Sequence, residues 1–128
     1  MTTTTNGATT GAETTTRSRR SRATRAATMI EELTQQRVAL PRMGPGASAS
    51  ERRDGRLRRA LIAARLAGWW RVLARTTAWG EVPEVFVTAA YSARYAERDK
   101  ARKALDSARF WADRAQAQPR MDVSGSDR

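Results

Sequence analysis

The arginines are the side chains of this chain whose type and spacing predict chemistry. Lys and Arg number 24 against 13 Asp and Glu, which gives a net charge of +11, and only Lys100 and Lys103 are lysines. Guanidinium groups stay protonated and donate paired hydrogen bonds to phosphate or carboxylate oxygens. Residues 17–25 carry +5 and residues 51–80 carry +6, so two blocks supply the excess. This clustering favours binding to a polyanion.

The first block is a short basic arm that follows a threonine-rich stretch. Flexible arginine-rich segments make salt-sensitive contacts with phosphates that do not depend on base sequence. The alternative is a solvated tail that keeps the protein soluble. The arm presents five arginines: Arg17, Arg19, Arg20, Arg22 and Arg25.

The second block lies at the beginning of a predicted helix. A helix N-terminus already carries positive partial charge, so arginines there are unfavourable by tenths of a kcal/mol each unless an anion neutralises them. Glu51 and Asp54 offset the charge only in part. We expect either a nucleic acid or another polyanion at this end, or a plain solvated face. The block contains Arg52, Arg53, Arg56, Arg58 and Arg59.

The composition excludes several kinds of site. The chain has no Cys and no His, so disulfides, Cys/His zinc sites and His general bases are absent. Neither a Gly-rich phosphate loop nor a pair of catalytic carboxylates is recognisable. We therefore expect no catalytic residue, no metal site, no cofactor and no enzymatic activity. No apolar run reaches the length of a transmembrane helix.

Helix signals divide the remaining chain into one all-α domain over residues 26–118. Thr28 with Glu31, and Ser48 with Glu51, have the spacing of helix-initiating capping boxes. Proline and glycine mark the predicted helix ends. The predicted segments are a disordered Thr-rich tail and basic arm over 1–25, helices over about 28–40, 51–79 and 83–118, and a disordered tail over 119–128.

The second predicted helix has two apolar stripes and therefore two neighbours. One stripe contains Leu57, Leu61, Val72 and Trp79. The other, predicted to be a partner interface or the seat of the first helix, contains Ile62, Leu66, Trp69 and Leu73. The helix is thus expected to be the middle of a bundle.

The third predicted helix presents a narrow face of alanines, which allows close packing against the second helix. The short turn between them makes the two helices antiparallel neighbours. Centring the turn at Gly80–Val82 places Leu57 level with Leu105 and Arg65 level with Glu97. We expect a long hairpin with the shorter first helix packed on it, and an Arg65–Glu97 ion pair across it.

Together these features predict a small basic helical protein that binds DNA or RNA non-specifically through its arginine clusters. A second hypothesis is a structural or adaptor subunit that self-associates or docks on a protein partner. A third is peripheral binding to an anionic membrane through Arg71 and Arg75. We expect a cytoplasmic location, although the Thr- and Arg-rich beginning also resembles a targeting segment in composition.

Overall fold

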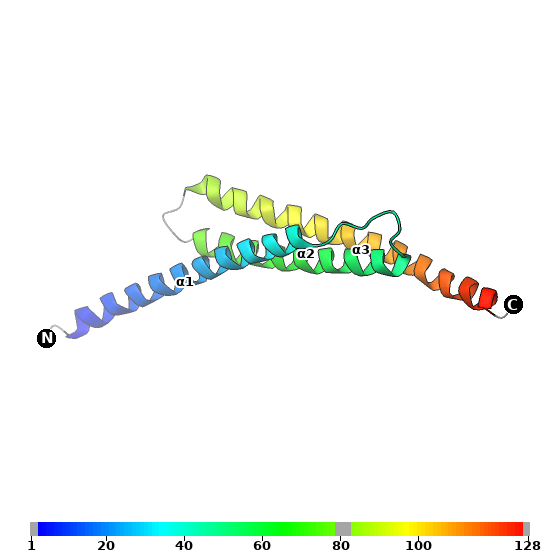
Figure 1. Ribbon diagram of the computed structural model, residues 1–128. Coiled ribbons are helices and arrows are strands. Elements are labelled where there is room, and N and C mark those ends of the chain that lie inside the picture. Colours follow the sequence, from blue (N-terminus) through cyan, green and yellow to red (C-terminus); the bar gives the residue numbers. More distant parts are fainter. Residues whose placement is uncertain (1–2, 79–82, 127–128) are drawn as a thin grey trace.

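The computed structural model describes the backbone of residues 3–78 and 83–126, and the side-chain surroundings of Thr15 and of residues 17–77 and 83–117. Within these ranges the chain forms helices without strands, as the all-α prediction required. The helices are α1 (Thr3–Ala39), α2 (Ala49–Ala78) and α3 (Glu84–Ser126). They form an elongated bundle with the chain termini at opposite ends (Figure 1).

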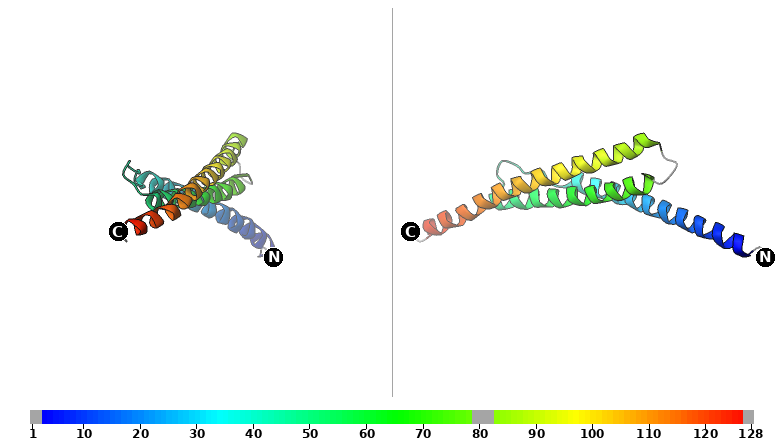
Figure 2. Two further views of the ribbon diagram at one scale, coloured as in Figure 1. Left: turned by 90° about the vertical axis from the view of Figure 1, so that its right-hand side faces the viewer. Right: turned by 180° about the vertical axis from the view of Figure 1, so that it is seen from behind.

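Helix α2 is the middle element of this bundle, as predicted, but among the described residues only one of its two apolar stripes meets a neighbour, because Leu57 and Leu61 of the other stripe are 44% and 52% exposed. Both α1 and α3 pack against α2, whereas the backbones of α1 and α3 make no contact over the described residues. The three helices cross at visible angles when the molecule is seen end on (Figure 2). Any feature shared by α1 and α3 therefore depends on side chains that reach across α2.

The hydrophobic core lies between α1 and α2 and is small. Leu33 of α1 packs with Ile62 and Leu66 of α2, and Leu66 is the only large side chain with less than 2% exposure among the described residues. Partly buried side chains complete this core: Ile30, Leu40, Trp69 and Trp70. The prediction that this α2 stripe binds another molecule is therefore corrected, because α1 of the same chain covers it.

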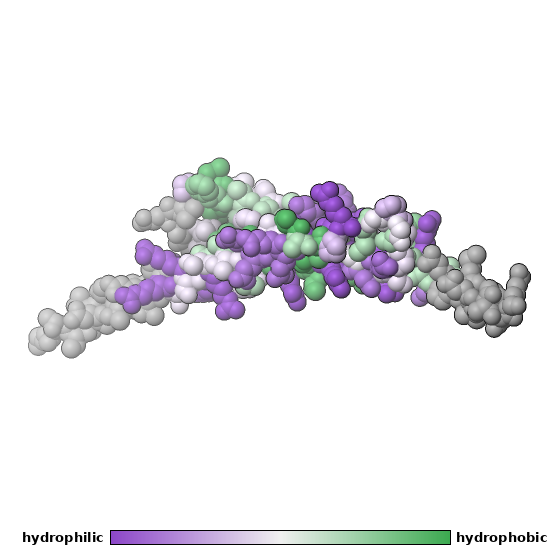
Figure 3. All heavy atoms as spheres, in the orientation of Figure 1, coloured by the Kyte–Doolittle hydropathy of each residue, from purple (hydrophilic) through white to green (hydrophobic). Residues whose placement is uncertain are grey.

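The α2–α3 hairpin is held by small side chains, as the alanine pattern predicted. Alanine lets two helix backbones approach closely but buries little area, so this contact is stabilised mainly by dispersion along its length. The buried alanines are Ala63, Ala67 and Ala74 of α2 with Ala90, Ala108 and Ala115 of α3. Phe86 is 62% exposed, because α3 begins at a distance from α2 (Figure 1), and hydrophobic residues gather on the surface at this end of α3 (Figure 3).

Two predicted helix caps have different outcomes. The Glu51 backbone N–H donates to the Ser48 hydroxyl at 3.1 Å, which confirms Ser48 as the residue that caps α2. Thr28 does not cap a helix. Its hydroxyl donates to the Thr24 carbonyl at 3.0 Å, a bond within a continuous helix, and α1 begins at Thr3.

The terminal segments also differ from the prediction. Residues 3–25, expected to be disordered, belong to α1, and α3 passes through Pro119, expected to end it, to reach Ser126. No proline precedes Pro41, so no residue of α1 lacks the backbone N–H that the helical hydrogen bonds need. Threonine hydroxyls that bond to the preceding turn are compatible with such a helix. Trp79, predicted on an apolar stripe, lies outside the described residues.

The core makes a direct prediction about stability. Leu66→Ala should lower the free energy of unfolding by about 3 kcal/mol, because it removes buried methyl groups and leaves a cavity. Leu61→Ala is the matched control, because Leu61 lies on the same helix but is 52% exposed. It should cost less than about 1 kcal/mol. Urea unfolding followed by circular dichroism measures both, and similar losses for the two variants would contradict the described core.

Candidate nucleic-acid interface

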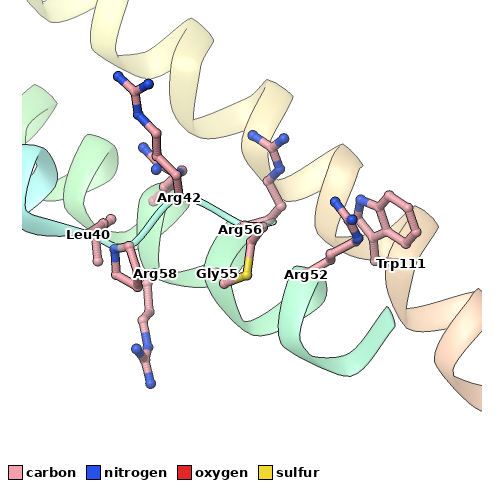
Figure 4. Close-up of a pocket in the computed structure, with 10 residues that line it drawn as sticks. Leu40, Arg42, Arg52, Gly55, Arg56, Arg58 and Trp111 are labelled. Atoms are coloured by element: carbon pink, nitrogen blue, oxygen red, sulfur yellow. The ribbon is translucent and has the colours of Figure 1, made fainter. Parts of the chain in front are cut away.

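A crevice forms where the α1–α2 linker folds back over the beginning of α2 (Figure 4). Its volume is about 200 Å³. We call it the linker crevice, and its lining combines apolar and basic side chains: Leu40, Pro41, Arg42, Met43, Arg52, Gly55, Arg56, Arg58, Arg59 and Trp111. Gly55 lets the linker come close, because a Cβ at this position would lie 2.9 Å from the Met43 methyl carbon.

Arg52 fastens the linker to the hairpin. Its Nη2 donates to the Gly44 carbonyl at 2.9 Å and its Nε donates to the Ala47 carbonyl at 3.4 Å. The guanidinium carbon also lies 5.1 Å from the centre of the Trp111 ring, a cation–π contact between α2 and α3 (Figure 4). Arg52, predicted to bind nucleic acid, therefore has a structural role.

The other arginines of this block form fewer contacts with the rest of the protein. Arg53 pairs with its neighbour Asp54 at 3.0 Å. Arg56, Arg58 and Arg59 have no acidic partner within the part of the chain that the structure describes. Figure 4 shows Arg58 on the opposite side of α2 from Arg56, so the block is not one surface.

A second basic depression continues from the linker crevice along the hairpin. It has a volume of about 290 Å³ and draws on all three helices. Its lining is Arg37, Arg56, Arg59, Ala63, Lys100, Lys103 and Ala104. Because Arg56 and Arg59 line both depressions, we treat them as one feature, the basic groove. Eight basic residues line it and no acidic residue does, but the Arg58 side chain points to the opposite side of α2, so seven basic side chains remain in the groove.

Glu97 and Asp99 offset part of the charge of the basic groove. Glu97 is 6% exposed, and its Oε2 accepts from Arg37 Nη1 at 2.6 Å while Lys100 lies 3.5 Å from its Oε1. Hydrogen bonds from Lys103 and then Arg102 lower the pKa of the Asp99 carboxyl. Two carboxylates thus stand against seven cations, and the groove keeps a positive excess.

The predicted Arg65–Glu97 ion pair is wrong in its cationic member. Arg65 is exposed, and Arg37 of α1 holds Glu97 instead. The hairpin register places residue 65 level with Glu97, but level positions need not face each other. At about 100° per residue, Arg65 lies roughly 200° around α2 from Ala63, which faces α3.

The arginines of the predicted basic arm take several positions on α1. Arg17 and Arg20 are exposed, whereas the Arg25 guanidinium carbon lies 5.8 Å from the Trp69 ring centre and packs α1 onto α2. Arg19 and Arg22 meet α2 in a separate cleft of about 480 Å³. That cleft is lined by Arg19, Arg22, Arg75 and Thr76.

Four residues of the basic groove were missed by sequence reasoning: Arg37, Arg42, Lys100 and Lys103. A signal existed for Lys103, because the predicted hairpin register puts it level with Arg59. Arg37 follows Leu33 by one helical turn, but nothing in the sequence fixed how α1 would dock.

No group of three or more carboxylates or other metal-binding side chains occurs among the described residues, and no described helix is long and apolar enough to cross a membrane. The fold and site thus define a basic three-helix bundle. The chain matches no protein-family model, and no curated protein or solved structure matches it.

The contrast between Arg52 and Arg58 is testable. Arg52→Gln removes two bonds to carbonyls and the contact with Trp111, and should lower the free energy of unfolding by about 1–2 kcal/mol. Arg58→Gln should change it by less than about 0.5 kcal/mol, because Arg58 is exposed and unpaired. Thermal unfolding measures both variants. Equal stability of the two variants would contradict the structural role of Arg52.

Proposed function

We propose that this protein binds DNA or RNA non-specifically, with the basic groove holding the phosphate backbone. The observation that carries the proposal is the convergence of seven basic side chains, from three helices and the α1–α2 linker, on one continuous groove without an acidic lining residue. Phosphate oxygens are suited to such a site, because each guanidinium can donate two parallel hydrogen bonds to them.

Arg56 and Arg59 are the central contacts in this proposal. They line both parts of the groove, and no carboxylate of the described residues neutralises them. Arg42 and the two lysines extend the same surface, and the exposed Arg17 and Arg20 of α1 provide further sequence-independent contacts. The uncharged residues that line the second depression are Ala63 and Ala104, whose side chains offer no hydrogen bonds for reading bases. Affinity should therefore depend on phosphate charge rather than on base sequence.

The salt dependence of binding measures the number of phosphate contacts. For duplex DNA, the logarithm of affinity falls against the logarithm of salt concentration with a slope of about −0.9 for each phosphate neutralised. The double variant Arg56→Gln/Arg59→Gln should reduce this slope by about 1.8 and weaken binding by at least about tenfold at low salt. Fluorescence anisotropy with a labelled duplex of arbitrary sequence gives both quantities.

The control for this experiment is Arg98→Gln/Arg109→Gln. It removes the same charge from exposed positions of α3 that do not line the groove. Its effect on affinity should be clearly smaller. Equal losses in the two double variants would mean that net charge alone attracts the duplex, and binding that does not respond to salt would contradict phosphate recognition altogether.

A further inference from the structure

The side of α2 that faces neither α1 nor α3 is open and carries its own pattern. Leu57 is 44% exposed and Leu61 is 52% exposed, and a Cβ added at Gly68 would meet no atom within 4 Å. With the exposed Ala64 these residues follow one another at spacings of four, three and four. We call these four residues the open stripe.

The open stripe has the geometry of a coiled-coil seam. Its spacings alternate as the a and d positions of a heptad do, and such a seam accepts the side chains of a second helix as knobs in holes. Gly68 leaves a notch in the stripe, because it has no side chain and the space beside its Cα is open. A large apolar side chain from a partner helix fits this notch.

The charge beside the open stripe defines the partner further. Arg58 and Arg65 are exposed and occupy successive e positions next to the seam, where coiled coils choose partners by charge. Between Gly55 and Ala78 the sequence of α2 contains no acidic residue. A second copy of this chain would bring like charges together, so the seam disfavours self-association.

We propose that the open stripe is a docking site for an amphipathic helix of another protein, whose apolar seam is flanked by Glu or Asp. An anionic membrane is the less suitable occupant, because interfacial helices usually insert aromatic side chains. The tryptophans Trp69 and Trp70 pack against the α1–α2 core rather than beside the stripe. Arg58 is the one residue of this site that also lines the linker crevice, but its side chain lies on the opposite side of α2 from Arg56, so the open stripe is a different surface from the basic groove. Docking there does not depend on the proposed nucleic-acid binding.

A synthetic helix tests this docking directly. The probe is a labelled peptide of about four heptads with Leu at a and d and Glu at e and g. A shuffled peptide of the same composition is the control for plain attraction to a basic protein. Fluorescence anisotropy with the full chain should show at least about tenfold tighter binding of the patterned peptide.

Two variants locate the binding on the open stripe. Gly68→Leu fills the notch without meeting any neighbour and favours the helix, so the fold should be kept while affinity for the patterned peptide falls by at least about tenfold. Arg58→Glu/Arg65→Glu should also weaken binding. The matched reversal Arg17→Glu/Arg20→Glu on α1 should have little effect.

Several results would overturn the proposal. Equal binding of the patterned and shuffled peptides, or binding that Gly68→Leu leaves unchanged, would show that the stripe is not the site. Co-sedimentation of the wild-type protein with phosphatidylglycerol vesicles that Gly68→Leu abolishes would assign the stripe to a membrane. A concentration-dependent dimer that becomes monomeric in Gly68→Leu would assign it to a second copy.

Discussion

The ion pair between Arg37 and Glu97 is the interaction on which the arrangement of the three helices depends. The two residues belong to α1 and α3, whose backbones make no contact with each other within the described ranges. Glu97 is 6% exposed and would be costly to bury without a cation. The pair therefore fixes how α1 lies across α2, and by doing so it places Arg37 at the wall of the basic groove.

The same residue type performs two different tasks in this chain. Arg52 and Arg25 stack on tryptophans and hold elements together, while Arg56 and Arg59 remain without carboxylate partners at the centre of the groove. Solvated arginine is inexpensive to keep at a surface, but two unpaired arginines beside the other cations of the groove are electrostatically unfavourable without an anion. That imbalance is the physical basis of the proposed phosphate binding.

Helix periodicity predicted the hairpin, the middle position of α2 and the Ser48 cap, because these depend on spacing within one or two neighbouring helices. The docking of α1 was not predictable in the same way. It follows from Leu33 and Arg37 meeting α2 and α3 at positions far away in the sequence. For this reason the Ile62–Leu66 stripe was also compatible with another molecule. The expected Arg65–Glu97 pair failed because the hairpin register gives the position of a residue along the helix axis, but not the direction in which its side chain points.

A double-mutant cycle on Arg37 and Glu97 is the most direct test of this account. The free energy of unfolding would be measured for the wild type, Arg37→Met, Glu97→Gln and the double variant. We predict a coupling energy of about 1.5–3 kcal/mol, because Glu97→Gln leaves Arg37 without a carboxylate and Arg37→Met leaves the buried Glu97 with only the 3.5 Å contact to Lys100. A coupling energy below about 0.5 kcal/mol would contradict the claim that this pair fixes α1 against the hairpin.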